Sequence, residues 1–153
     1  MNPCMPVVAP STSPARPEEQ SRLRMTELME QIVSGGNMTD ALYQVVRNKG
    51  AAGIDGMEVR ELKPFLRENW ERIRGELLRG EYRPEPVRRV EIPKPEGGVR
   101  LLGIPTVVDR LVQQALQQVL TPVFDPEFSD NSYGFRKGRS ARGAILKARE
   151  HIR

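Results

Sequence analysis

The stretch Ile92-Pro-Lys-Pro-Glu-Gly-Gly-Val-Arg-Leu-Leu-Gly-Ile-Pro-Thr106 predicts two strands joined by a glycine turn. Residues 89–92 alternate charged and apolar side chains, which is the period of a half-buried strand, and residues 99–104 form the return strand. Gly97 and Gly98 supply the positive φ angles that a tight hairpin turn demands. Because Pro93 and Pro95 cannot donate hydrogen bonds to a sheet, we expect this end of the hairpin to be exposed.

Two cations lie near the tip of the predicted hairpin. Lys94 and Arg100 fall within a rung or two of each other. Cations on a stiff arm bounded by prolines suit a phosphate or a polyphosphate. The alternative is an ordinary hairpin with solvated charges, and this stretch alone leaves both interpretations open.

Composition narrows the class of protein and of partner. The chain has 153 residues, enough for one domain with a core, and 24 basic against 20 acidic residues give a net charge of +4. A mildly basic chain favours an anionic partner, usually nucleic acid. Cys4 and His151 are the only residues of their types, which excludes an internal disulfide and a zinc site built from them. The sequence shows neither a membrane span nor a signal peptide, so we expect a cytoplasmic protein with no membrane partner.

The chain before the hairpin predicts a lead and three helical segments. Residues 1–17 are rich in Pro, Ser and Thr, so we expect a disordered lead followed by a folded domain at 18–153. The first helix is expected to stop at Ser34-Gly35-Gly36. Asn37 is expected to cap the second helix, with Asp40 in its first turn. Its buried stripe is expected to be Leu42, Val45 and Val46.

Residues 51–56 read as a glycine-containing loop, which either approaches a partner closely or is a plain connector. Residues 58–79 place apolar side chains on one helix face, and Pro64 is expected to kink or split that helix.

The helix after the hairpin is predicted to be the centre of the core. Thr106 with Asp109 forms a capping box at its start. The apolar residues of 107–120 cover roughly 220° of the helix circumference, with glutamines on the remaining strip. Pro122 and Pro126 are expected to break the helix up.

The last segment is strongly basic. Tyr133 and Phe135 precede a run of arginines and lysines that contains Glu150 as its one acidic residue. Ser140 is expected to cap a final helix, on which Arg142, Arg149 and Arg153 lie within about 40° of one another. A solvated charge face is the alternative, but aromatics beside arginines and glycines are typical of base stacking and phosphate contacts.

Several short motifs follow one another along the chain, and their order is the same as in a known protein family. They are Asn48-Lys-Gly-Ala-Ala-Gly-Ile-Asp-Gly56, Tyr82-Arg-Pro84, Arg88-Arg-Val-Glu-Ile-Pro-Lys-Pro-Glu-Gly-Gly-Val-Arg100, Leu102-Gly-Ile-Pro-Thr106, Asp109-Arg110, Gln113-Gln-Ala115, and Ser132-Tyr-Gly-Phe-Arg136 with Gly138-Arg-Ser140. From about Met29 onward the chain resembles the N-terminal part of bacterial group II intron reverse transcriptases, the intron-encoded maturases. The resemblance implies an α+β fold: the fingers and the start of the palm of a right-hand polymerase, mostly helical with one β-hairpin. The sequence departs from the family at Lys137, where Pro is usual, and at Arg142-Gly143, where a His and a polar residue are common.

The resemblance also implies roles and partners. Lys94 and Arg100 would contact the triphosphate of an incoming deoxynucleotide. The block that contains Lys49 would form a lid over template and primer. The remaining contacts to intron RNA or template are expected from the last segment, at Tyr133, Phe135, Arg136, Arg139, Arg142 and Arg149.

Carboxylates limit the chemistry expected of this chain. Two-metal polymerases hold Mg²⁺ with carboxylates that converge, and no Asp-Asp pair occurs here. In the family these ligands lie beyond the matched segment. We therefore expect no catalytic or metal-binding residue in this chain, which would be inactive alone, with Mg²⁺ required by the complete parent enzyme. The alternatives are a stand-alone RNA-binding module and a non-functional remnant. A surface that would meet the missing palm and thumb also suggests self-association.

Overall fold

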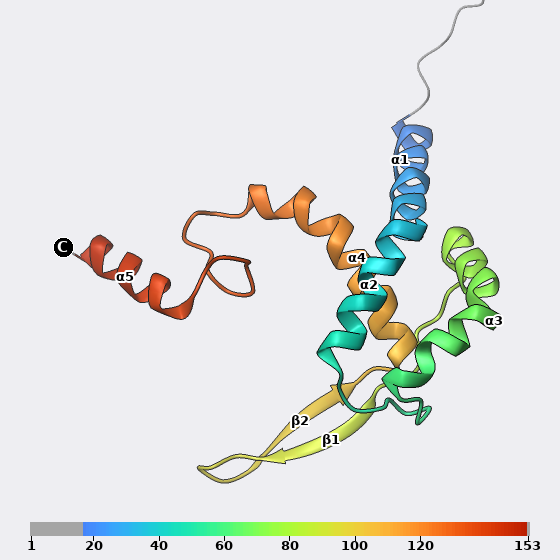
Figure 1. Cartoon of the computed structure of the whole chain (residues 1–153). Coiled ribbons are helices and arrows are strands. Elements are labelled where there is room, and N and C mark those ends of the chain that lie inside the picture. Colours follow the sequence, from blue (N-terminus) through green and yellow to red (C-terminus); the bar gives the residue numbers. More distant parts are fainter. Residues whose placement is uncertain (1–16, 153) are drawn as a thin grey trace, which may run out of the picture.

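The computed structural model describes residues 17–152 and confirms a mostly helical α+β fold with one hairpin (Figure 1). The predicted disordered lead lies outside the described residues apart from Pro17, where the first helix begins. The elements in chain order are α1 (Pro17–Ile32), α2 (Gly35–Asn48), α3 (Val59–Arg79), β1 (Arg88–Pro93), β2 (Val99–Ile104), α4 (Val107–Phe124), the 3-10 turn η1 (Asp125–Glu127) and α5 (Ala141–Ile152). Within 17–152 no helix is both long and apolar enough to cross a membrane.

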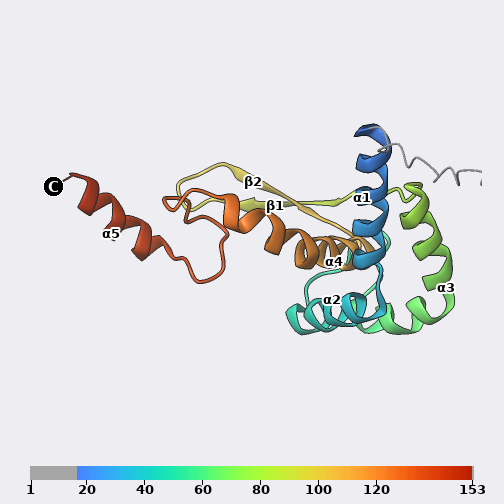
Figure 2. The same ribbon diagram turned by 90° about the horizontal axis from the view of Figure 1, so that it is seen from above.

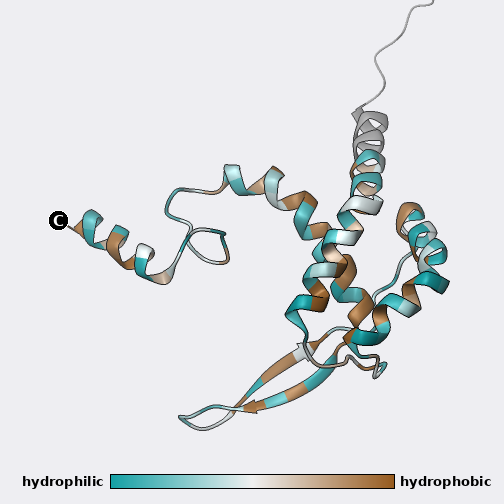
Figure 3. Cartoon of the chain, in the orientation of Figure 1, coloured by the Kyte–Doolittle hydropathy of each residue, from teal (hydrophilic) through white to brown (hydrophobic). Residues whose placement is uncertain are grey.

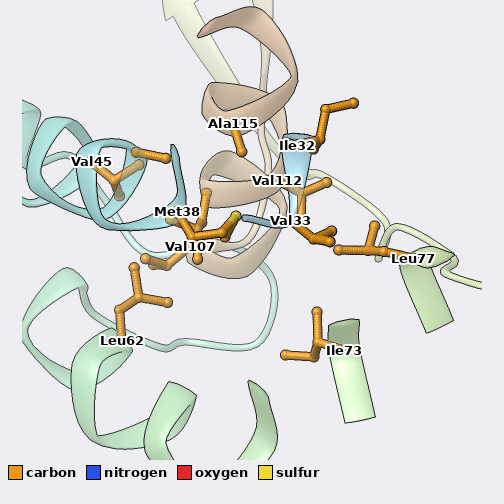
Figure 4. Close-up of a cluster of buried hydrophobic side chains, with 12 residues drawn as sticks. Ile32, Val33, Met38, Val45, Leu62, Ile73, Leu77, Val107, Val112 and Ala115 are labelled. Carbon is orange, nitrogen blue, oxygen red and sulfur yellow. The ribbon is translucent and has the colours of Figure 1, made fainter. Parts of the chain in front are cut away.

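The first half of α4 is the centre of the core, as predicted. It packs against α1, α2 and α3, and it buries Val107, Leu111, Val112 and Ala115 (Figure 4). Its second half leaves this body, so Val123 and Phe124 are about half exposed. The predicted stripe of α2 was partly wrong, because Met38, Ala41 and Val45 are buried while Val46 is exposed.

The junction between α1 and α2 differs from the prediction. Ser34, not Asn37, is the N-cap of α2, and its hydroxyl accepts a hydrogen bond from the Asn37 backbone N–H at 3.4 Å. The glycines therefore lie in the first turn of α2, and Asp40 lies beyond it. Asn37 instead ties elements together, since its side-chain amide donates to the Ile32 carbonyl at 2.8 Å and to the Ala115 carbonyl at 3.1 Å.

Two prolines lie inside helices. Pro64 lies inside α3, which is a single helix from Val59 to Arg79 and bends along its course (Figures 1 and 2). Pro122 lies inside α4, which continues to Phe124 before the 3-10 turn that contains Pro126. The α3 helix is therefore bent and not split, and the α-helix after the hairpin ends between Pro122 and Pro126, as predicted.

The hairpin forms with the predicted turn but not with the predicted burial. Gly97 and Gly98 have φ angles of +94° and +82°, and Ile92 pairs with Arg100 across the strands. Both strands are exposed along nearly their whole length, so the half-buried strand expected at 89–92 was wrong. Figure 3 shows apolar segments on this projecting arm and on α5, which contacts no other helix or strand among the described elements.

Candidate nucleic-acid interface

The hairpin holds Lys94 and Arg100 at its exposed end. The Lys94 backbone N–H donates to the Gly98 carbonyl at 3.0 Å, and the Gly97 N–H donates to the Lys94 carbonyl at 3.1 Å. These two hydrogen bonds close the turn at the tip of the hairpin and fix the position of the Lys94 backbone. Within residues 17–152 neither the Lys94 ammonium nor the Arg100 guanidinium has an ion-pair partner. Both cations are therefore open to an anionic ligand.

The loop at residues 49–56 is fixed against the start of α4. The Arg110 guanidinium donates to the Lys49 carbonyl at 3.2 Å and to the Ala51 carbonyl at 2.9 Å. Gly53 is buried so close to Thr106 that a Cβ there would come within 2.6 Å of the Thr106 Cα. This loop is thus packed against the protein on one side while the Lys49 side chain stays exposed.

A polar cavity of about 230 Å³ lies beside this loop. Lys49, Asn48 and Arg110 line it together with glutamines of α4. Its lining holds two cations and no acidic residue, a composition that suits an anion. Arg110 was not among the predicted site residues, although it belongs to the Asp109-Arg110 motif in the first turn after the Thr106 cap.

A second cavity, of about 560 Å³, continues along α4. Gln114 and Gln117 line both cavities, so the two adjoin. The far end of the second cavity is lined by Phe135, Arg136 and Lys137. The two cavities therefore form a path, lined in part by glutamines, from Lys49 along α4 to the segment before α5.

Arg136 acts within the fold rather than on its surface. Its guanidinium donates to both carboxylate oxygens of Asp125, at 2.8 and 3.2 Å, and to the carbonyls of Asp125, Ser129 and Ser132. It also lies over the Phe128 ring, and its side chain is only 10% exposed. The hydrogen bond from Arg136 holds the pKa of Asp125 below its usual value. Arg136 thereby closes the loop between η1 and α5.

The other residues predicted to bind RNA in this segment differ in how exposed their side chains are and in whether other groups already contact them. Arg139 lies over the Tyr133 ring at 5.1 Å and contacts Asp130, and only part of its side chain is exposed. Phe135 is fully exposed at a φ of +57°, an unusual backbone angle for a bulky residue. Arg142 and Arg149 are exposed, and their side chains have no hydrogen bond or ion pair in the described part of the chain. Arg153 lies outside the described residues.

The carboxylates do not form a metal site in the described residues. Residues 17–152 contain no group of three His, Cys, Asp or Glu side chains placed to hold a metal ion. Asp109, the one aspartate buried in this part of the chain, accepts hydrogen bonds from the Tyr82 hydroxyl, the Thr106 hydroxyl and the Glu85 backbone N–H. It stabilises the approach of residues 82–85 to the start of α4. The described residues thus do not fit a two-metal centre.

Comparison with known proteins adds to this geometry. Residues 92–152 match the family described as "Reverse transcriptase (RNA-dependent DNA polymerase)". The chain is 39% identical over 125 residues to Protein YkfC of Escherichia coli, a match that covers 80% of this chain and 33% of the relative. It is 38% identical over 106 residues to Group II intron-encoded protein LtrA of Lactococcus lactis, covering 69% and 18%. It is 29% identical over 132 residues to Putative COX1/OXI3 intron 1 protein of Saccharomyces cerevisiae, covering 86% and 15%. The chain therefore spans a third or less of these relatives.

Proposed function

Because this chain belongs to the reverse transcriptases encoded by group II introns, we propose that it contributes the contacts to incoming deoxynucleotide and RNA template of such an enzyme. Lys94 and Arg100 bind the triphosphate. Lys49 and the segment with Tyr133, Phe135, Arg139, Arg142 and Arg149 bind template or intron RNA. Arg136 supports the second group by holding its loop in place.

The observation that carries the RNA proposal is the set of cations around the two adjoining cavities. Lys49 lies at one end and Lys137 at the other, with the exposed Arg142 and Arg149 beyond. None of these four side chains has a hydrogen bond or ion-pair partner in residues 17–152. Their charges are uncompensated, and Phe135 adds an open aromatic face for base stacking.

The salt dependence of RNA binding tests this proposal on the chain itself. Each phosphate contact releases counterions, so log affinity falls by roughly 0.7 per contact for each tenfold rise in salt on single-stranded RNA. Changing Arg142→Ala and Arg149→Ala together should flatten that slope by about 0.7 to 1.4. The matched control is Arg67→Ala with Arg74→Ala on α3, which removes the same charge from exposed positions that line neither cavity and have no ion-pair partner among the described residues.

The measurement is binding of a structured intron RNA at several KCl concentrations for wild type and both double variants. Equal slopes for wild type and the Arg142/Arg149 variant would remove α5 from the interface. An equal decrease of the slope in both double variants would mean that RNA binding depends only on the net charge of the chain.

A second candidate function uses the same surface without polymerisation: a stand-alone RNA-binding module. It is favoured by the lack of a carboxylate cluster in the described residues. In the polymerase proposal, Mg²⁺-dependent synthesis requires palm and thumb segments like those of the longer relatives, and this chain alone is inactive. Primer extension on an RNA template by the purified chain, with Mg²⁺ present, would overturn that part.

A further inference from the structure

Lys49 has an unusual backbone conformation for a residue that is not glycine. It directly follows α2 with a φ of +54° and a ψ of −140°, a combination that glycine adopts freely and that crowds the Cβ of any other residue. Backbone strain of this kind persists only where the surrounding structure holds it in place, and it clusters at sites that bind ligands. Another group of the protein must therefore hold Lys49 in this conformation.

The Arg110 side chain is placed to hold it. Its Nη1 donates to the Lys49 carbonyl at 3.2 Å, and its Nη2 donates to the Ala51 carbonyl at 2.9 Å. One planar guanidinium thus bonds the carbonyls on both sides of Gly50, and its rigid fork fixes both peptide groups at once. The Arg110 Nε is buried without a hydrogen-bond partner among the described residues, which costs free energy. The contribution of Arg110 to the loop therefore lies in these two bonds, which we call the carbonyl clamp.

Gly50 leaves the room that the carbonyl clamp needs. Its φ is +112°, and a Cβ built there would lie 2.5 Å from the Arg110 Nη1. That nitrogen is the one that bonds the Lys49 carbonyl. Any side chain at position 50 would push the guanidinium away from this carbonyl, so Gly50 and Arg110 form one contact.

Lys49 and Arg110 also line the same cavity of about 230 Å³, but they are not equivalent there. Both Nη atoms of Arg110 are engaged by the loop carbonyls. The Lys49 side chain is exposed and has no ion-pair partner in the described part of the chain. Of the two cations, Lys49 is the one open to a phosphate, and Arg110 is the one that determines where Lys49 lies.

We propose that Arg110 is a positioning residue, which holds Lys49 in its strained conformation and thereby sets the place at which the Lys49 ammonium meets RNA. Arg110 influences RNA binding through the shape of the loop and not through a contact of its own. This inference rests on the proposed function for the RNA contact of Lys49, whereas the carbonyl clamp itself does not depend on that function.

Two substitutions break the clamp without changing the net charge. Arg110→Lys replaces the planar fork with a compact ammonium, and Gly50→Ala places a Cβ against Nη1. In ¹H–¹⁵N spectra, Arg110→Lys should shift the amide signals of Gly50 and Ala52, because the carbonyls of those two peptide groups accept the clamp bonds. Gly50→Ala should shift the Arg110 Nε–H signal. The matched control is Gly56→Ala, which also has a positive φ, of +74°, but nothing near its missing Cβ, and it should leave that signal in place.

A comparison of single and double variants tests whether Arg110 acts through Lys49. Lys49→Ala should weaken binding of a structured intron RNA at a fixed KCl concentration by about threefold to tenfold. Arg110→Lys should cause a similar loss although the charge is unchanged, and so should Gly50→Ala but not Gly56→Ala. In the Lys49→Ala background, Arg110→Lys should change the affinity by less than about twofold, because the group that it positions is gone. Fluorescence anisotropy with labelled RNA measures all of these affinities.

The possible results separate this inference from the proposed function. Unchanged spectra in both clamp variants would show that the guanidinium does not hold the loop. An equal loss from Arg110→Lys in both backgrounds would mean that Arg110 contacts RNA independently of Lys49. Full affinity of Arg110→Lys and Gly50→Ala beside a weakened Lys49→Ala would mean that the clamp does not position the ammonium. Each of these three results overturns the inference. Wild-type affinity of Lys49→Ala would instead refute the Lys49 contact of the proposed function, and with it the effect of Arg110 on RNA, while the spectra would still decide whether the clamp exists.

Discussion

At the scale of single residues, the hydrogen bond from Tyr82 to Asp109 makes stability depend on pH. Burial, and next that 2.7 Å bond, raise the pKa of Tyr82 well above its ordinary value of 10.0. The folded protein keeps the phenol proton at pH values where the unfolded chain loses it. The stability contributed by Tyr82 is therefore complete below about pH 10 and falls as the pH rises above it.

Tyr82→Phe should accordingly lower the free energy of unfolding by about 1 kcal/mol at pH 8 and reduce its decline above pH 10. Urea unfolding at a series of pH values measures both effects. The control is Tyr43→Phe, since Tyr43 is 63% exposed. If both variants followed the wild-type pH profile, the Tyr82–Asp109 bond would contribute nothing to it.

At the scale of elements, the loop at 49–56 owes its position to a close backbone contact. A Cβ at Gly53 would lie 2.6 Å from the Thr106 Cα and 2.8 Å from the Thr106 nitrogen, and backbone cannot yield as a flexible side chain can. Gly53→Ala should therefore destabilise the protein by roughly 1–3 kcal/mol and displace the loop from α4. Chemical shifts at Lys49 and Thr106 would follow the displacement.

Gly36→Ala is the matched control for this substitution. Gly36 lies in α2 with nothing near its missing Cβ, so alanine there should leave stability unchanged or slightly higher. Equal behaviour of the two variants would show that the loop does not depend on the contact with Thr106.

At the scale of the whole molecule, the structure divides into a packed body and two projecting parts. The body is formed by α1 to α4, and the hairpin and α5 extend from it (Figure 1). Hydrogen exchange should therefore be slowest for amides near Leu111 and Ala115 and fastest, among helices α2 to α5, in α5. Protection of α5 equal to that of α4 would contradict this division.

The features predicted correctly from the sequence were mostly local. The Gly97-Gly98 turn and the Thr106 cap each follow from neighbouring residues, and the core role of α4 follows from its own periodicity. The features that were missed depend on contacts across longer distances. Ser34 caps α2 while Asn37 reaches Ala115, 78 residues away, and Arg136 closes a loop on Asp125. The burial of β1 was mispredicted because alternation indicates two faces without saying whether anything covers them.

The exposed hairpin has a mechanical consequence. Its strands pair from Arg88–Ile104 at the base to Pro93–Val99 near the tip, and two residues after Ile104 the chain enters the Thr106 cap of α4. A strand of six residues is about 20 Å long, so a tilt of roughly 10° at the base moves the tip by about 3.5 Å. The hairpin therefore tilts about its base, next to the start of α4. Small rotations there are amplified into displacements of Lys94 comparable to the length of a hydrogen bond.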